Sequence, residues 1–259
     1  MPLRVSGNPT NIVTQDGRSK TSTHLSTNIY LAVDNNNGPL IVIMAGTHGN
    51  EPTGTHAIYD LIEALNTNKI KLKKGKLILI PEVNYCALKV GIRFIPFIGD
   101  INRKYPHDIN KLYNNKLYNK CPIIDKVTNL IKDAHFVLDF HDGWGFHRIN
   151  NNSMGSTISP TDTKLSYEIA NLFKTKINDT ISDKKKHFNI FTNDTQLLSN
   201  EYYSKENNIK GSLRYYMNVT KQNYILIETS GQNNIQPLEI RKKQCNMFIN
   251  ELFSYYNFI

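Results

Sequence analysis

A histidine and a glutamate stand three residues apart among small, turn-forming residues in AGTHGNEPTG, residues 45–54. The segment follows a run of apolar residues, and its two glycines near the histidine allow the backbone to turn sharply before a helix that we expect to start near Glu51. Side chains at positions i and i+3 of such a turn can point the same way. His48 and Glu51 are therefore candidate partners in one site.

A second histidine, His141, follows the apolar run HFVLDF and also precedes a glycine. Two histidines and one carboxylate are the three protein ligands of a catalytic zinc ion, with a fourth position left open for water. Taken singly, each residue is more often a loop histidine or a helix-capping glutamate. Together, and with the carboxylate of Glu228 at the end of the run YILIE, they predict a metal site with catalytic capacity.

Strands and helices alternate along the chain and must position these side chains. Central strands are predicted where apolar, β-branched runs are too continuous for one-sided burial, at 27–33, 39–45, 76–82, 135–140 and 223–228. Helices are predicted from apolar residues at helical spacing, at 51–66, 123–134, 164–177 and 237–256.

This pattern predicts an α/β fold: a single domain, residues 1–259, with a central mixed, largely parallel sheet covered by helices on both faces. No repeat and no Gly/Ser-rich or Pro-rich linker divides the chain. Ligands of such sheets bind beyond the carboxyl ends of the strands, which is where the candidate residues lie.

Composition excludes several other classes of protein. The chain has 39% hydrophobic residues and a formal net charge of +9, but its basic clusters at 69–76 and 182–187 are short and are interpreted as solvated loop and strand edge, so nucleic acid is not the expected partner. No apolar stretch has the length of a membrane span, and the N-terminus lacks the apolar core of a signal peptide. Three widely spaced cysteines fit a reducing compartment. We therefore expect a cytoplasmic protein without membrane partners.

The segment GTHGNEPTG is similar to the Gly-x-His-Gly-x-Glu signature of the zinc carboxypeptidase superfamily, particularly its succinylglutamate desuccinylase and aspartoacylase branch. This resemblance runs from about Ile41 to the C-terminus, with its motifs in the family's order. It implies the zinc carboxypeptidase-like fold and one zinc ion per chain, held by His48, Glu51 and the His141 of DFH at the end of a central strand.

The resemblance also implies roles for residues in two further motifs and for one arginine between the motifs. In DINR, Asp100 would orient a zinc-ligating histidine, and Asn102 with Arg103 would bind the substrate carboxylate. Arg93, which precedes that motif, would polarise the scissile carbonyl. Glu228 in ILIETSGQ would be the general base, taking a proton from water and returning it to the leaving amine.

Two departures from the aspartoacylase pattern bear on the substrate. That branch carries a separate C-terminal β domain, whereas only a single helix's worth of chain follows Glu228. The run HDGWGF, starting at His141, is similar to the branch that trims bacterial cell-wall peptides. Both departures favour a peptide substrate with a free carboxylate, cleaved by a metallocarboxypeptidase, and leave a deacylase of N-acyl amino acids as the alternative.

Two alternatives of other classes remain from the sequence. A non-catalytic metal- or nucleic-acid-binding protein would explain the positive charge but not the ligand set, the base and the carboxylate clamp together. An endo-acting metalloprotease lacks the expected His-Glu-x-x-His helix. The sequence leaves open the oligomeric state. It also leaves open whether Trp144, His147 or Arg148, just past the strand of His141, or Arg214, Tyr215 or Tyr216 in SLRYYMN, line the site.

Overall fold

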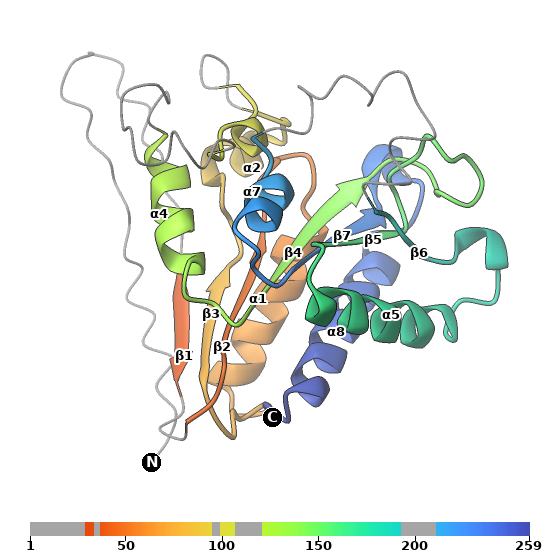
Figure 1. Ribbon diagram of the computed structural model, residues 1–259. Coiled ribbons are helices and arrows are strands. Elements are labelled where there is room, and N and C mark those ends of the chain that lie inside the picture. Colours follow the sequence, from red (N-terminus) through yellow and green to blue (C-terminus); the bar gives the residue numbers. More distant parts are fainter. Residues whose placement is uncertain (1–28, 34–36, 95–98, 107–120, 193–210) are drawn as a thin grey trace.

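The computed structural model describes residues 29–33, 37–94, 99–106, 121–192 and 211–259 (Figure 1). Within these residues seven strands form one mixed sheet in the order β1-β3-β2-β4-β7-β5-β6. The strands are β1 Tyr30–Val33, β2 Leu40–Ala45, β3 Lys76–Ile80, β4 Phe136–Gly143, β5 Thr157–Pro160, β6 Asn189–Ile190 and β7 Tyr224–Ser230. The central strands β3, β2, β4 and β7 are parallel, whereas β1 and β5 run antiparallel to their neighbours β3 and β7.

Six α-helices of the described residues pack around this sheet. They are α1 Thr53–Asn66, α2 Tyr85–Val90, α4 Pro122–Ile131, α5 Lys164–Asn178, α7 Leu213–Val219 and α8 Leu238–Tyr255. In α1, Ile58, Leu61, Ile62 and Leu65 recur at helical spacing and form its buried stripe. The expected α/β fold, a largely parallel sheet with helices on both faces, is confirmed.

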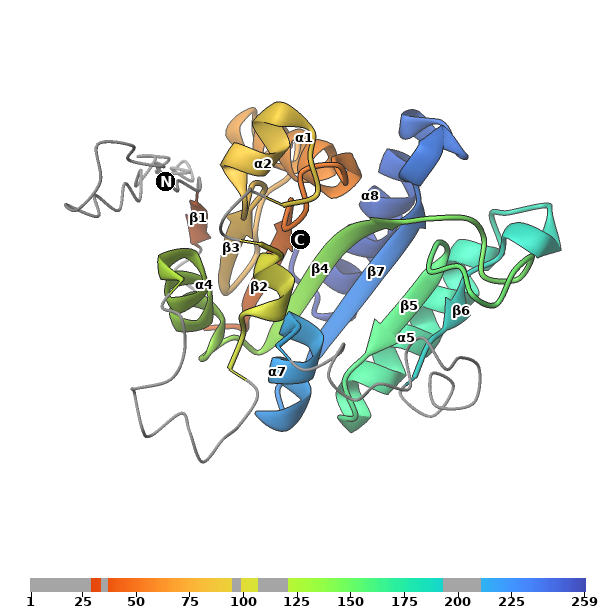
Figure 2. The same ribbon diagram turned by 90° about the horizontal axis from the view of Figure 1, so that it is seen from above.

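Alternation along the strands divides the core into two layers. Ile41 and Ile43 of β2 face a cluster formed with α1, α5 and α8, whereas Val42 and Met44 face a second cluster formed with α4 and α7. Figure 2 shows these two groups of helices on opposite sides of the sheet. Because both faces are covered, the central strands carry apolar residues on both faces over much of their length, which is why the sequence identified them.

The strand and helix predictions hold for the longest segments and fail for the shortest. Strands β5 and β6 were not predicted, because β5 is the short, largely polar TISP and β6 has two residues. The short helices α2 and α7 were missed as well. Helix α1 begins at Thr53, close to the expected start near Glu51, and directly after a turn in which the Glu51 N–H donates to the His48 carbonyl (3.2 Å).

Other expectations are only partly covered by the structure. Residues 27–28 of the first predicted strand lie outside the described residues. The single domain over 1–259 stays a prediction, because several other segments also lie outside them. The basic cluster at 182–187 is an exposed loop with a 3₁₀ turn, as expected of a solvated segment. In the described parts of the chain, no helix is both long enough and apolar enough to cross a membrane.

Candidate active site

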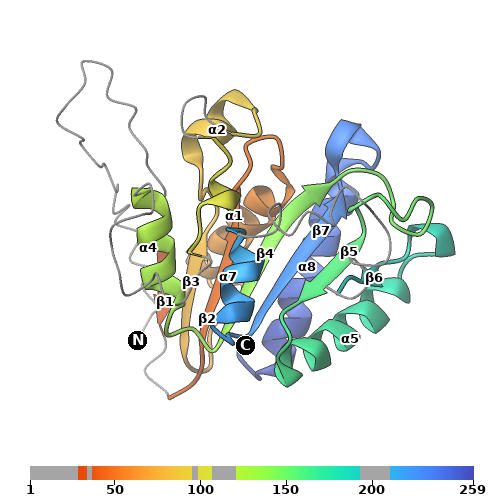
Figure 3. The same ribbon diagram turned by 45° about the horizontal axis from the view of Figure 1, so that its top comes forward.

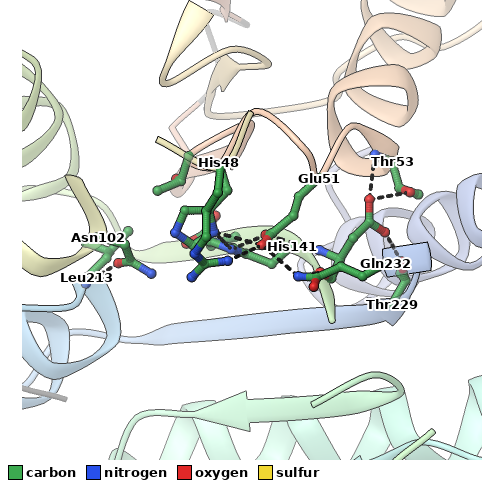
Figure 4. A network of polar contacts seen from close by, with 12 residues as sticks. His48, Glu51, Thr53, Asn102, His141, Leu213, Thr229 and Gln232 are labelled. Atoms are coloured by element: carbon green, nitrogen blue, oxygen red, sulfur yellow. Dashed lines mark hydrogen bonds and ion pairs between the residues drawn. The ribbon is translucent and has the colours of Figure 1, made fainter. Parts of the chain in front are cut away.

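The three predicted metal ligands lie together at the carboxyl ends of β2 and β4 (Figure 4). His48 and Glu51 come from the loop between β2 and α1, and His141 comes from β4. One ligand atom from each residue lies within 4.8 Å of the others, and each residue is 3% exposed. The His48 Nδ1 atom is 2.9 Å from Glu51 Oε1, and His141 Nδ1 is 2.7 Å from Glu51 Oε2.

The loop reaches this position through a sharp turn directly after β2. Gly46 has a φ of +72°, a conformation that residues with a Cβ rarely adopt. A Cβ there would also lie 2.9 Å from the carbonyl oxygen of Pro81. Backbone geometry therefore requires a glycine at position 46, and the turn at this glycine brings His48 back over the end of the strand.

A carboxylate lies beside the outer nitrogen of each histidine, and only the one beside His48 is hydrogen-bonded to it among the described residues. His48 Nε2 lies 3.1 Å from Asp100 Oδ1, and His141 Nε2 lies 3.4 Å from Asp139 Oδ2. With the Nε2 atoms directed at these carboxylates, the two Nδ1 atoms face each other at 3.2 Å beside Glu51. This arrangement leaves both Nδ1 atoms directed at a common point, as in a carboxylate–histidine–metal arrangement.

The pKa values in the cluster follow from its burial and its close charges. Burial raises the pKa of Glu51, but the adjacent imidazoles of His48 and His141 outweigh it and hold that pKa far below its usual value. Burial lowers the pKa of His141, but Asp139 and Glu51 hold it well above its usual value. Burial raises the pKa of Asp100 as well, but the hydrogen bond to His48 outweighs this effect and holds that pKa below its usual value.

Glu228 lies beside this cluster on the neighbouring strand β7. It is the register partner of His141, so both side chains leave the same face of the sheet, the face that carries α4 and α7 (Figure 3). Burial raises the pKa of Glu228 to about 8, with His141 opposing the shift and Glu51 adding to it. A carboxyl group with so high a pKa is suited to accept and return a proton near neutral pH.

Both strands continue past these residues. β4 extends two residues beyond His141 to Gly143, and β7 extends two residues beyond Glu228 to Ser230. The expectation that His141 and Glu228 end their strands is therefore wrong in detail, because ladder pairing carries on through Asp142–Thr229 and Gly143–Ser230.

The residues of the DINR motif and Arg93 reach the same cluster from a separate segment. Arg93 lies 2.8 Å from Glu51 Oε1 and 3.4 Å from Asp100 Oδ2. Asn102 accepts a hydrogen bond from the Leu213 backbone N–H (2.9 Å) at the start of α7, which fixes its side chain. Arg103 is exposed, and the only hydrogen bond of its guanidinium to the described residues is to the carbonyl of Asn102 (2.8 Å). Its guanidinium therefore remains available to a ligand.

A cavity of about 280 Å³ opens above the cluster and joins these groups. Its lining includes the predicted His48, Glu51, Arg93, Asn102, Arg103 and Glu228. It also includes residues that the sequence reasoning did not single out, among them Met154, Ser159, Tyr224, Leu226 and Gln232. Tyr224 and Leu226 alternate with Glu228 along β7, so strand periodicity could have identified them.

The cavity decides among the residues that the sequence left open. Trp144 and Arg214 line it, whereas the candidates His147 and Arg148 do not. Among the described residues, Tyr224 is the tyrosine that lines it, rather than Tyr215 or Tyr216. Tyr216 instead packs in the core between α7 and the sheet. Arg214 is buried, and its guanidinium donates to the carbonyl oxygens of Pro160 (3.4 Å) and Phe191 (3.2 Å).

The donor set fits a zinc ion. Two imidazole nitrogens and a carboxylate are ligands that zinc accepts in catalytic sites, and their convergence around one point matches a three-ligand open site. The carboxylates of Asp100 and Asp139 lie beside the Nε2 atoms of the two histidines. They favour the tautomer with the proton on Nε2, which leaves Nδ1 able to bind a metal.

Comparison with known proteins bears on the identity of this site. The family model of the succinylglutamate desuccinylase/aspartoacylase catalytic domain matches residues 37–175, which is more than half of the chain. N-alpha-acetyl-L-2,4-diaminobutyric acid deacetylase of Halomonas elongata is 31% identical over 108 residues, which are 41% of this chain and 29% of that protein. The aligned part is thus less than a third of that relative.

Solved structures of low sequence identity share the fold. Product-bound cell shape determinant Csd4 of Helicobacter pylori superposes with a TM-score of 0.72 at 19% identity, over 90% of this chain and 56% of that chain. Csd4 is a D,L-carboxypeptidase, and another of its structures that shares the fold has mDAP bound. An aspartoacylase family protein of Mesorhizobium loti gives a TM-score of 0.60 at 17% identity, over 91% and 62%. This chain therefore spans little more than half the length of these proteins.

Proposed function

The chain belongs to the succinylglutamate desuccinylase/aspartoacylase family, and from that premise we propose that it is a zinc-dependent hydrolase cleaving an amide bond next to a free carboxylate. The observation that carries this proposal is the convergence of His48, Glu51 and His141 at one end of a cavity that Glu228 also lines. The ligand set, a candidate base and the guanidinium groups of Arg93, Arg103 and Arg214 line that space.

His48, Glu51 and His141 would hold the zinc ion through their Nδ1 and carboxylate atoms. Zinc bound there supplies Lewis acidity, which lets water lose a proton near neutral pH and polarises a carbonyl group. Asp100 keeps the imidazole of His48 in the ligating tautomer by accepting from its Nε2, and the carboxylate of Asp139, 3.4 Å from His141 Nε2, favours a proton on that nitrogen.

Glu228 acts as the proton carrier in this proposal. Its carboxylate takes the proton of the attacking water and passes it to the leaving nitrogen, which must be protonated before the amide bond can break. Arg93, already directed into the cluster, donates to the oxygen on which negative charge develops.

Arg103 and Asn102 bind the free carboxylate of the substrate. The planar guanidinium of Arg103 suits bidentate binding of a carboxylate, and Asn102 is held in place by the Leu213 N–H. Arg214 adds a buried positive charge to the cavity. Its hydrogen-bond partners among the described residues are backbone carbonyls, which carry no charge. The cavity therefore favours an anionic substrate.

The leaving group is either a residue of a peptide or a free amino acid. The carboxypeptidase activity of Csd4, which shares the fold over most of this chain, supports a peptide or cell-wall-type peptide substrate. The family model and the Halomonas deacetylase support the alternative, a deacylase of N-acyl amino acids. Both reactions cleave the same kind of bond beside a carboxylate.

Substrate pairs that differ only at the terminal carboxylate test this function. The zinc-loaded protein is assayed by mass spectrometry against N-acyl amino acids and peptides, each with a free and an amidated carboxyl terminus. A bidentate, charge-assisted contact contributes roughly 2 to 4 kcal/mol, so free carboxylates should be cleaved about 30- to 1,000-fold faster in kcat/KM. Arg103→Ala should abolish this preference.

Arg148→Ala is the matched control. Arg148 is exposed and bonded to Asn189 Oδ1 (2.9 Å), outside the residues that line the cavity, so its loss should leave the preference intact. Equal cleavage of free and amidated substrates by the unaltered protein would contradict both the carboxypeptidase and the deacylase assignments and would leave an endo-acting hydrolase.

A further inference from the structure

A buried polar cluster joins the C-terminal helix to the back of the metal-ligand site. Its centre is Asp142, the residue after His141, which is 1% exposed and points to the opposite face of the sheet from His141. Asp142 Oδ2 accepts from the backbone N–H (3.1 Å) and the hydroxyl (2.7 Å) of Thr53. Asp142 Oδ1 accepts from the Thr229 hydroxyl and from Arg241 of α8 (2.9 Å).

The backbone of Asp142 contacts the predicted metal ligand directly. Its N–H donates to Glu51 Oε2 (3.3 Å), and its carbonyl accepts from Gln232 Nε2 (2.7 Å). The same Gln232 nitrogen donates to Glu51 Oε1 (3.2 Å). One oxygen of Glu51 therefore accepts from the Asp142 N–H, and the other accepts from Gln232, which is itself bonded to the Asp142 carbonyl. Figure 4 shows Gln232 beside Glu51, with Thr53 and Thr229 on the far side of the cluster.

Arg241 is the only charged group paired with Asp142 among the described residues. It is 4% exposed, and it also donates to the Gln236 carbonyl (2.9 Å) and to the Thr53 hydroxyl. Gly231 makes this approach possible, because a Cβ there would lie 2.4 Å from the Arg241 guanidinium and 2.3 Å from Asp142 Oδ1. A buried carboxylate without its cation would pull in water or shift position.

We propose that Arg241 is a positioning residue for the metal site, acting through Asp142 on Glu51 and His141. Thr53 is the first residue of α1, so the ion pair fixes the start of that helix two residues after Glu51 as well as the strand that carries His141. This inference rests on the proposed zinc site. It makes the docking of α8 and the binding of zinc mutually dependent, since any coupling between two equilibria acts in both directions.

Zinc affinity measures this coupling without any substrate. Substitution of groups that hold metal ligands from behind commonly weakens metal binding 10- to 100-fold, so Arg241→Met should raise the zinc dissociation constant by about that factor in chelator competition. Arg241→Lys, which retains the charge, should restore part of the affinity. Lys242→Met is the matched control, because Lys242 is the next residue of α8 and pairs with Asp60 (3.2 Å) and Glu239 (3.2 Å) at the surface.

A purely structural role for Arg241 would give a different result. It would lower the melting temperature of the zinc-free and zinc-loaded protein alike and leave the dissociation constant within twofold of the original, which would overturn the proposal. Equal weakening by Lys242→Met would overturn it too. Failure of the unaltered protein to bind zinc would instead contradict the proposed function.

Hydrogen exchange on the unaltered protein provides a test that does not depend on a variant folding. Saturation with zinc should slow amide exchange in the first turns of α8, around Arg241, as well as in β4. Slowed exchange in β4 with no change in α8 would show that the helix is not coupled to the site.

Discussion

Tyr224→Phe isolates one buried hydrogen bond behind the proposed metal ligand His141. The Tyr224 hydroxyl donates to Asp139 Oδ2 (2.9 Å), and Asp139 is 1% exposed with no hydrogen-bond partner for its other oxygen among the described residues. Burial, with the charge of Asp139, raises the pKa of Tyr224 well above its usual value, so the phenol remains a donor. The substitution removes that donor and no other heavy atom.

The expected loss of stability follows from this environment. A hydrogen bond to a charged, buried acceptor contributes about 1.5 to 3 kcal/mol. Unfolding entropy of about 2.1 cal/mol/K per residue gives roughly 0.5 kcal/mol/K for this chain of 259 residues, so the melting temperature should fall by about 3 to 6 °C. Calorimetry or circular dichroism at neutral pH, with a chelator present, measures this change.

Tyr105→Phe is the matched control. Tyr105 is fully buried in the same core cluster, but its hydroxyl has no hydrogen-bond partner in the described chain. Removing that hydroxyl should leave the melting temperature unchanged or raise it, because an unpaired polar group is lost from the interior. Equal losses for the two variants, or a Tyr224→Phe protein within 1 °C of the original, would refute the reasoning.

Two further predictions concern the metal and the base. The double variant His48→Ala, His141→Ala should bind no stoichiometric zinc by elemental analysis, because one of three ligands remains; full occupancy would place the site elsewhere. Glu228→Gln retains the size of the side chain but cannot accept a proton, so kcat should fall on the order of 100-fold or more while zinc remains bound. Turnover at the original rate would require another base.

The sequence determined those features that depend on short stretches of chain. His48 and Glu51 are brought together by a turn of a few residues, which their spacing and glycines already specify. The central strands could be predicted from the sequence because a strand buried on both faces needs a continuous run of apolar residues, as in LIVIMA of β2 and YILI of β7. The resemblance of four motifs to one family then supplied the order in which the remaining candidates occur.

Tertiary structure alone decided which distant residues meet. Asp139 and Tyr224 are 85 residues apart, and Asp142 and Arg241 are 99 apart, so no local spacing relates them. Their pairing depends on β4 lying next to β7 and on α8 packing behind both, and the sequence does not encode that strand order in any short pattern.

The short strand β5, between β7 and β6, illustrates the same limit. It is too short and too polar to be recognised, yet it places Ser159 in the cavity, and the carbonyl of its last residue, Pro160, accepts a hydrogen bond from Arg214. A strand of this kind forms because the neighbouring β7 offers a complete edge of hydrogen-bonding groups, not because its own residues favour it. The chemistry of the candidate site could thus be predicted from local sequence, whereas the groups that support it depend on long-range packing.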